Sequence, residues 1–200
     1  MEIKRLSLGD YAANCYIVLD TDSNECAVID PGANSNIIKR TLDDMNIHNI
    51  KFILLTHGHA DHTQAAVDIK NIYNAPIYIN QEDYKMMESG SFMYGNIHKD
   101  IDKFIKDGDM LTLGNMNIKV IHTPGHTPGG VSFLIGDVLF TGDTLFAGSI
   151  GRTDMLGGNF KTLIDSIKGK LMKLSDDIIV LPGHQGKSSI GNERENNPFL

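Results

Sequence analysis

Residues 56–62 read "THGHADH" and place three histidines and an aspartate within one short stretch. The whole chain has only 8 histidines in 200 residues, so this density stands out from its composition. The apolar segment before it, "KFILL", is typical of a buried strand. A loop that only capped the next helix would explain Asp61 but not the three histidines. We therefore expect the segment to bind metal.

The spacing within the motif predicts ligands for two metal ions. Alternate residues of an extended segment face the same way, so His57, His59 and Asp61 can converge on one side. His62 points elsewhere unless the backbone turns, as it would if a helix began near Asp61. Neutral imidazole and carboxylate groups are ligands that suit zinc, iron and manganese.

Further candidate ligands follow other β-rich segments, each close to a glycine. His122 and His126 lie in "HTPGHTPGG", Asp143 ends "FTGD", and His184 ends "VLPGH". Loops at the ends of strands commonly carry functional side chains. We therefore expect these segments to meet the first motif at one edge of a sheet.

The overall composition excludes several classes of partner. The net charge is −7, with 18 basic and 25 acidic residues and no basic block, so a nucleic-acid partner is not expected. No apolar run approaches the ~20 residues of a membrane helix, and the start of the chain lacks a signal-peptide core. A cytoplasmic protein is therefore expected.

The remaining cysteines and histidines are expected to have no special role. Cys15 and Cys26 lack C-x-x-C spacing and are expected to be buried thiols, while His48 and His98 are expected to be ordinary surface residues.

Strand-like and helix-like segments occur in both halves of the chain. This pattern favours an α/β (α+β) fold with sheets in the middle and helices outside, and the length fits one domain over residues 1–200. The segment from 81 to 105 is harder to interpret: "QEDYKMME" favours a helix, "SGSFMYGN" a loop or lid, and its role is open. Strands are expected at 3–8, 15–20, 26–30, 51–56, 76–80, 117–123, 130–136, 138–142 and 177–183, and helices at 34–47, 63–74, 81–88 and 160–174.

The motifs "THGHADH", "HTPGHTPGG", "TGDTLF" and "LPGH", in that order, resemble those of the metallo-β-lactamase-fold hydrolases. The likeness is greatest to the short single-domain relatives of glyoxalase II (hydroxyacylglutathione hydrolase), and "NCYIVLD…VIDPG" extends it towards the N-terminus. The resemblance implies a four-layer αββα sandwich with a dinuclear metal site at the sheet edges.

The resemblance also implies a role for each ligand. Asp143 would bridge two divalent ions, most simply zinc, although iron or manganese would also fit, and Asp61 would orient a metal-bound hydroxide. His122 falls outside the ligand pattern and is expected to be structural. Asp30 in "VIDPG" would either orient a ligand imidazole or close a turn. The expected ligands are His57, His59 and His126 for the first ion, and Asp61, His62 and His184 for the second.

Such a ligand set predicts a hydrolase. Two cations about 3.5–4 Å apart lower the pKa of a shared water from ~15.7 towards neutrality, so no serine, cysteine or lysine nucleophile is required. A leaving thiolate, with a pKa near ~8.5, departs without strong acid catalysis. We therefore expect a small-molecule thioester or ester, similar to a hydroxyacylglutathione, as the substrate.

Individual residues distinguish this chain from several branches of the metallo-β-lactamase-fold hydrolases. His59 stands where flavin-linked di-iron relatives carry glutamate, and Asp143 is present where many true β-lactamases lack a bridging aspartate. Full-length glyoxalase II has a helical C-terminal domain that grips glutathione, and the residues after His184 leave no room for it. Arg152 and Asp154 stand near the family's lysine and tyrosine positions, so Arg152 would bind a substrate carboxylate or pair with Asp154.

Three alternatives remain at the sequence level, and one of them is the hydrolysis of other substrates such as lactones, phosphodiesters or β-lactams. "GRTD" is shared with the persulfide dioxygenase branch, whose members hold one iron in the same shell; one iron per chain and rapid oxygen uptake with glutathione persulfide would favour that reading. A non-catalytic binding module is the third, and the complete ligand set argues against it. The sequence does not determine the acyl group, the thiol, the native metal or the oligomeric state.

Overall fold

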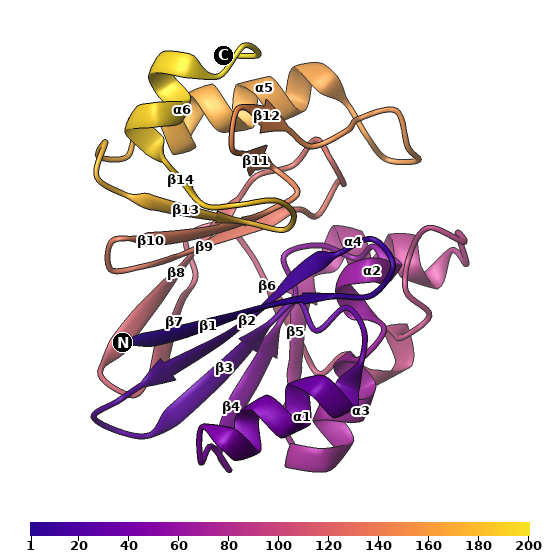
Figure 1. The fold of residues 1–200 in the computed structure, drawn as a ribbon. Helices are drawn as coiled ribbons and strands as arrows, with labels where there is room; N and C mark the ends of the chain where they lie inside the picture. Colours follow the sequence, from indigo (N-terminus) through magenta and orange to yellow (C-terminus); the bar gives the residue numbers. More distant parts are fainter.

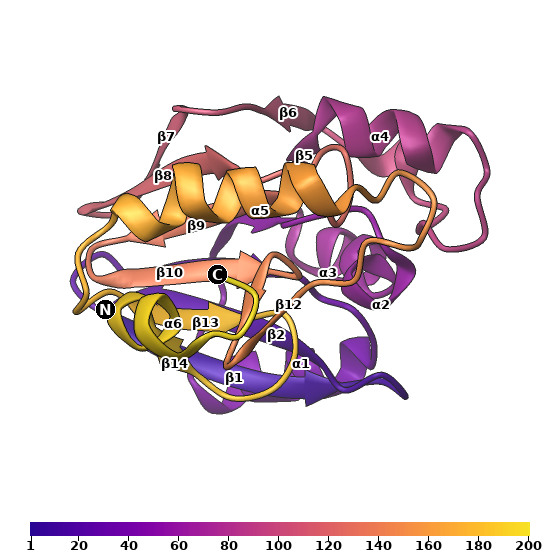
Figure 2. The same ribbon diagram turned by 90° about the horizontal axis from the view of Figure 1, so that it is seen from above.

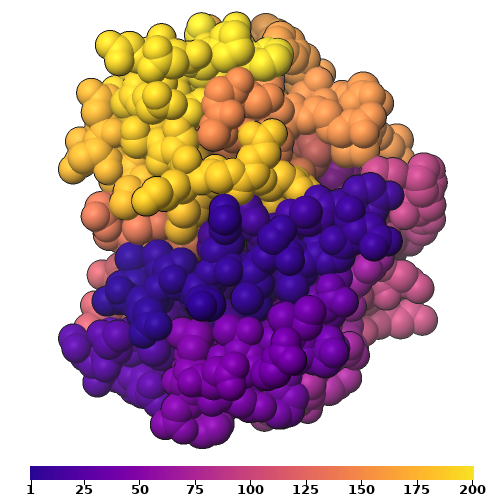
Figure 3. Space-filling view, in the orientation of Figure 1, coloured from indigo at the N-terminus to yellow at the C-terminus, as the bar shows by residue number.

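Two six-stranded sheets pack face to face in the computed structural model, which describes residues 1–200 (Figure 1). Helices cover the outer face of each sheet. In Figure 3 the indigo-to-magenta N-terminal half and the orange-to-yellow C-terminal half form two stacked blocks. The arrangement is a four-layer αββα sandwich, which confirms the expected fold class.

The first sheet belongs to the N-terminal half. β1, β2 and β3 are antiparallel neighbours, whereas β3, β4, β5 and β6 run parallel to one another. Its spatial order is β1 (Glu2–Leu8), β2 (Ala13–Asp20), β3 (Glu25–Ile29), β4 (Ile50–Leu54), β5 (Ile77–Asn80) and β6 (Lys103–Ile105).

The second sheet is mostly antiparallel. Its one parallel pair is β10 with β13. A short hairpin, β11 (Leu145–Phe146) with β12 (Ser149–Ile150), lies beside it. The spatial order of the sheet is β14 (Ser188–Ser189), β13 (Ile179–Pro182), β10 (Val138–Gly142), β9 (Val131–Ile135), β8 (Met116–His122) and β7 (Met110–Leu113).

The helices are divided between the two outer faces. None of them is long and apolar enough to cross a membrane. Figure 2 shows α5 running along the second sheet. The first half contains α1 (Ser35–Asp44), α2 (Ala60–Thr63), α3 (Ala66–Tyr73), α4 (Gln81–Glu88) and the 3₁₀ turn η1 (His98–Asp100), and the second half contains α5 (Phe160–Gly169), the 3₁₀ turn η2 (Leu171–Lys173) and α6 (Ile190–Asn196).

Three apolar cores fill the three spaces between the four layers. One lies under α1 and α3, one lies between the sheets, and one lies under α5. The period-two alternation of β2 shows how a strand serves two of them: Ile17 packs in the first core and Val18 in the second. Both faces of each sheet are therefore buried, which explains the nearly continuous apolar strands in the sequence.

Several elements differ from the sequence expectation. The helix expected at 63–74 is split into α2 and α3, and α2 begins within the histidine motif. The helix expected at 160–174 ends at Gly169 and continues as a 3₁₀ turn, although Leu171 still packs in the same core and so preserves the apolar periodicity. The strands β6, β7, β11, β12 and β14 were not expected because such short segments carry little periodic signal. Cys15 and Cys26 are buried free thiols, as expected.

Candidate metal centre

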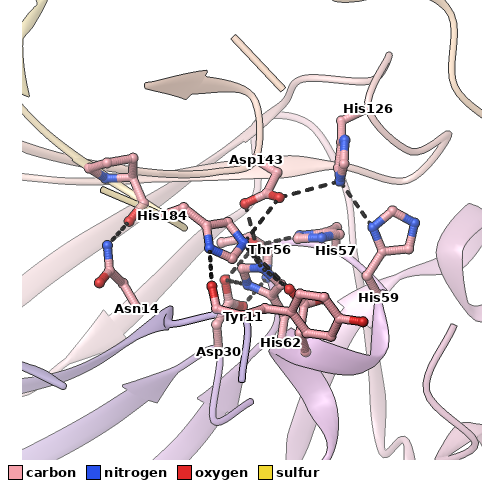
Figure 4. A network of polar contacts seen from close by, with 12 residues as sticks. Tyr11, Asn14, Asp30, Thr56, His57, His59, His62, His126, Asp143 and His184 are labelled. Atoms are coloured by element: carbon pink, nitrogen blue, oxygen red, sulfur yellow. Dashed lines mark hydrogen bonds and ion pairs between the residues drawn. The ribbon is translucent and has the colours of Figure 1, made fainter. Parts of the chain in front are cut away.

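The candidate ligands lie just beyond the carboxyl ends of strands. Asp30 follows β3, the "THGHADH" motif follows β4, His126 follows β8, Asp143 follows β10 and His184 follows β13. Within each sheet these strands run in the same direction, because β8 and β10 are both antiparallel to β9. All five loops therefore open at one edge of the sandwich, where Figure 4 shows the side chains converging.

His57, His59 and His126 form a buried group. Their candidate ligand atoms all lie within 4.8 Å of one another, and His126 Nε2 is 3.0 Å from His59 Nδ1. His57 Nε2 is buried and has no hydrogen-bond partner, and His59 turns its Nδ1 towards His126, which leaves His59 Nε2 buried and unpartnered on the other side of its ring. Buried nitrogens without partners are rare and costly, and a cation among these rings would satisfy the lone pairs that face it.

Asp61, His62 and His184 form a second group at the same edge. The Nε2 atoms of His62 and His184 are 3.3 Å apart, and the Nε2 atom of His184 is 3.4 Å from Asp61 Oδ2. His59 has extended backbone angles and α2 begins at Ala60, so the chain turns between the two groups. Because of this turn, His62 lies beside Asp61 instead of pointing away from it. The spacing of the motif required such a turn if His62 was to act as a ligand.

Asp143 lies between the groups. Its Oδ1 is 3.5 Å from His62 Nε2, and its Oδ2 is 3.5 Å from the Nε2 atoms of both His126 and His184. A Cβ added at Gly183 would lie 2.2 Å from Asp143 Oδ1, so the His184 loop approaches this carboxylate closely only because residue 183 is glycine.

Hydrogen bonds on the far side of the rings orient two of the imidazoles. His126 Nδ1 donates to the backbone oxygen of Arg152 at 2.7 Å, and His184 Nδ1 donates to that of Tyr11 at 3.1 Å. A carbonyl oxygen only accepts, so the hydrogen-bond network assigns the proton of each neutral ring to Nδ1. Their Nε2 lone pairs then face the centre of the site.

Asp30 orients two further rings, those of His57 and His62. Its carboxylate accepts from the Thr56 amide at 2.7 Å, from the Thr56 hydroxyl at 2.6 Å and from His62 Nδ1 at 3.0 Å. With its hydroxyl proton given to Asp30, Thr56 Oγ1 accepts from His57 Nδ1 at 3.0 Å. Asp30 also has a positive φ of 50° directly after β3. Of the two roles considered for Asp30 from the sequence, its contacts correspond to orienting an imidazole.

The electrostatics of the two groups differ. Burial lowers the pKa of His57 well below its ordinary value, with repulsion from neighbouring imidazoles adding to the effect. Burial likewise lowers the pKa of His59 to about 3 and lowers that of His126. In this group the rings therefore remain neutral at physiological pH, as metal ligands must be.

Carboxylates dominate the second group. Burial opposes protonation of His62, but the charges of Asp143, Asp30 and Asp61 outweigh it and raise its pKa to about 9. The pKa of His184 is also raised, because contacts with Asp61 and Asp143 outweigh burial. The pKa of Asp61 is lowered to about 2: burial opposes ionisation, and the two histidines overcome that cost.

Arg152 contacts the centre through its backbone rather than its side chain. Its guanidinium forms two hydrogen bonds of 2.8 Å with the carboxylate of Asp154, and both side chains are mostly exposed. The ion pair considered from the sequence is therefore present. His122 lies outside the cluster and donates to the backbone oxygen of Pro128 at 3.0 Å, while His48 is exposed and His98 is half-buried.

Two residues of the 81–105 segment lie next to the site without any sequence signal for it. Asp83, fully buried in α4, accepts hydrogen bonds from Gly58, Thr127 and Gly129. The Tyr94 ring lies 4.8 Å from that of His59 in an edge-on contact. An aspartate in a polar helical segment resembles an ordinary surface residue, and only the packing of α4 shows otherwise.

Residues 8–184 match the model of the metallo-beta-lactamase superfamily. The chain belongs to this superfamily. It is 38% identical to hydroxyacylglutathione hydrolase GloC of Haemophilus influenzae, over 100% of this chain and 98% of that protein. The crystal structure of the BLEG-1 B3 metallo-beta-lactamase superposes with a TM-score of 0.90 at 33% identity, covering 100% of this chain and 99% of that one. The structure of TTHA1623 in a di-iron-bound form gives 0.84 at 29% identity, covering 98% and 100%. The protein is thus a metallo-hydrolase of this superfamily with a histidine-rich metal site.

Proposed function

We propose that the protein hydrolyses small-molecule thioesters with two divalent cations held at the carboxyl edge of the two sheets. The observation that carries the proposal is the pair of facing ligand groups with Asp143 between them. The similarity to a hydroxyacylglutathione hydrolase supports a thioester as the substrate. The proposed ligands are His57, His59 and His126 for one cation, Asp61, His62 and His184 for the other, and Asp143 for both.

The donor set fits borderline and hard divalent metals. Imidazole nitrogens with carboxylate oxygens suit zinc, and iron or manganese would also be accepted; the di-iron relative supports iron as an alternative. When bound, such a pair of ions supplies Lewis acidity for the substrate carbonyl and lowers the pKa of a water molecule.

The chain's own residues supply orientation. Asp61 is half-buried and its pKa is lowered to about 2, so its carboxylate is ionised and can accept a hydrogen bond from the attacking water. Thr56, Asp30 and the backbone carbonyls of Arg152 and Tyr11 hold four of the five rings in the tautomer that points Nε2 inwards, whereas His59 presents its Nδ1. A departing thiolate requires no proton from these groups.

Arg152 is proposed to contact the substrate. Its guanidinium is mostly exposed, while its backbone oxygen lies directly behind His126. An exposed Arg–Asp pair contributes little stability, so a substrate carboxylate could replace Asp154 as the partner at small cost.

The test is metal analysis of purified protein combined with a panel of acyl-glutathione and other thioesters. We expect two ions per chain, thioester cleavage that is lost on chelation, and recovery of that activity with zinc. Oxygen uptake with glutathione persulfide is measured in parallel. One iron per chain with rapid oxygen consumption and no thioester cleavage would instead establish a persulfide dioxygenase.

A further inference from the structure

A cavity of about 600 Å³ lies between residues 89–93 and the segment around Arg152 and Leu156. Figures 1 and 3 show these two loops on the same side of the molecule, in magenta-pink and orange. The cavity contains none of the proposed metal ligands, yet both of its walls continue into the metal centre.

The connections are direct. The backbone oxygen of Met93 accepts a hydrogen bond from Ala60, the residue after His59, at 2.9 Å. On the opposite wall, the backbone oxygen of Arg152 accepts from His126 at 2.7 Å. Tyr94 joins the walls, because its hydroxyl donates to the Leu156 oxygen at 3.3 Å while its ring contacts His59. The cavity is therefore linked to the first histidine group through two backbone contacts and the Tyr94 ring.

The side chains of the cavity favour an apolar ligand. Phe92, Met93, Met155 and Leu156 line it, and Phe92 is 90% exposed while Leu156 is 60% exposed. Large apolar side chains left in solvent around a concave surface mark binding sites, and flexible methionines adapt to chains of different shape. Arg152 and Asp154 also line the cavity, and their ion pair leaves no net charge there until a substrate carboxylate replaces Asp154 as the partner of Arg152.

We propose that this cavity binds an apolar chain of the thioester substrate, so that the enzyme prefers long alkyl groups to short polar ones. The inference rests on the proposed thioester hydrolysis. The apolar chain can belong to the acyl group or to the thiol, and the chemistry of the cavity is the same for both.

Two substrate series separate these sources. One varies the acyl group from acetyl to decanoyl on N-acetylcysteamine, and the other keeps acetyl and varies an alkyl thiol. We expect kcat/KM to rise about two- to fourfold per methylene in one series until the cavity is filled. Phe92→Ser and Leu156→Ser should flatten that rise, whereas Met110→Ser, which changes an exposed apolar residue on β7, should not.

The possible results distinguish a failure of the proposed role of the cavity from a failure of the proposed thioester hydrolysis. Hydrolysis that shows no dependence on chain length, or the same dependence in all variants, would overturn the role of the cavity and leave the proposed function intact. If no thioester is cleaved, the proposed function fails. Octanoate titration followed by NMR of the Met93 and Met155 methyl groups then decides on the cavity: shifts that disappear in Phe92→Ser support it, and unchanged signals overturn it.

A second inference rests on Asp83, a carboxylate with no exposed surface. It accepts from the Gly58 amide at 2.7 Å, the Thr127 hydroxyl at 2.8 Å and the Gly129 amide at 2.6 Å. Gly58 lies between His57 and His59, and Thr127 follows His126, so one side chain ties together the two loops that carry the first histidine group. A Cβ on Gly129 would lie 2.5 Å from the Asp83 amide, which shows how closely the loop approaches α4.

We infer that Asp83 is a positioning residue for the first cation site, which itself rests on the proposed function. Without its two acceptor oxygens, the amides of Gly58 and Gly129 would be buried without partners. Asparagine cannot replace it, because one of its two positions would present an N–H to an N–H. The second ligand group depends on other anchors, Asp30 and the Tyr11 carbonyl.

The test compares Asp83→Asn with the milder Thr127→Val. Glu193→Gln is the control, because Glu193 is an equally buried acid that accepts from Gly148 away from the site. In cobalt(II) competition titrations, we expect Asp83→Asn to weaken the site of His57, His59 and His126 roughly 10–100-fold and the other site much less. Equal weakening of both sites, or of neither, would overturn the inference; if Asp83→Asn does not fold, Thr127→Val should show the same selectivity.

Hydrogen exchange provides a reading that does not depend on metal. In metal-free protein, the amides of Gly58 and Gly129 should exchange faster in Asp83→Asn than in wild type, and Glu193→Gln should leave them unchanged. Unchanged exchange in Asp83→Asn would contradict the positioning role, whereas wild-type protein that binds no cation would contradict the proposed function instead.

Discussion

The two ligand groups arise partly from adjacent residues, yet their environments differ sharply. His57, His59 and His126 are buried among other rings, and their pKa values are lowered. His62 and His184 lie beside carboxylates, and their pKa values are raised. The first group thus offers neutral lone pairs before any cation arrives, whereas a cation entering the second group must displace protons.

The comparison teaches that burial alone does not set the protonation of a histidine. His57 and His62 are both almost completely buried, but only His62 contacts the carboxylate of Asp30 directly. The charge of Asp143, the hydrogen bond from His62 Nδ1 to Asp30 and the charges of Asp30 and Asp61 together reverse the direction of the pKa shift.

The largest effect is expected from His59→Ala. The substitution removes a ligand from the preformed group, so the first cation should be lost and kcat/KM for thioesters should fall roughly 1,000-fold or more, equivalent to about 4 kcal/mol. Metal content and steady-state kinetics measure both. Turnover close to that of wild type would refute the assignment of His59.

His184→Ala should have a smaller effect. His184 is half-buried and belongs to the group that must release protons, so the variant should retain the first cation and lose most of the second. Activity is expected to fall roughly 100-fold. A loss of both ions, or a larger kinetic defect than in His59→Ala, would mean that the two groups do not bind independently.

Asp30→Ala tests the link between the groups. Asp30 holds His62 directly and His57 through Thr56, so metal affinity should fall roughly 10–100-fold at both sites, unlike the selective loss expected for Asp83→Asn. The unpaired Thr56 amide should also lower the free energy of unfolding by about 1–3 kcal/mol. Competition titrations and urea denaturation measure the two effects; a change confined to one site would break the proposed link.

The pH dependence of stability gives a test in metal-free protein. Burial raises the pKa of Asp83 from 3.8 to about 6 against the opposing effect of its hydrogen bonds, so the folded chain keeps a proton that the unfolded chain releases. Its contribution is complete below about pH 4 and is lost as the pH rises through about 6, a change of about 3 kcal/mol. Urea denaturation should show the difference between wild type and Asp83→Asn shrinking over this range; a constant difference would exclude the shift.

The smallest effect is expected from His48→Ala. His48 is exposed and precedes β4, whereas the ligand motif follows the opposite end of that strand. We therefore expect kcat/KM and metal content to remain at wild-type levels and the free energy of unfolding to change by less than about 0.5 kcal/mol. A defect comparable to that of His184→Ala would show that histidines outside the two groups take part.

Much of the architecture could be read from local patterns. The apolar strands before each motif can be recognised in the sequence because both faces of each sheet are buried. The spacing of the motif also indicates that a helix has to begin near Asp61 for His62 to act as a ligand, and α2 begins at Ala60. The short strands and the break between α2 and α3 could not be predicted, because segments of two to four residues contain no full period.

The sequence by itself determined the candidate ligands, because imidazole and carboxylate groups at such spacings are rare by chance, and the resemblance of its motifs to a known family implied the αββα fold. The tertiary structure decided how those ligands are held and charged. Backbone carbonyls of Tyr11 and Arg152 orient His184 and His126, and every residue has a carbonyl, so no sequence signal marks these two. Asp83 likewise became visible only when α4 packed against both histidine loops, since burial is a property of the folded chain and not of the residue.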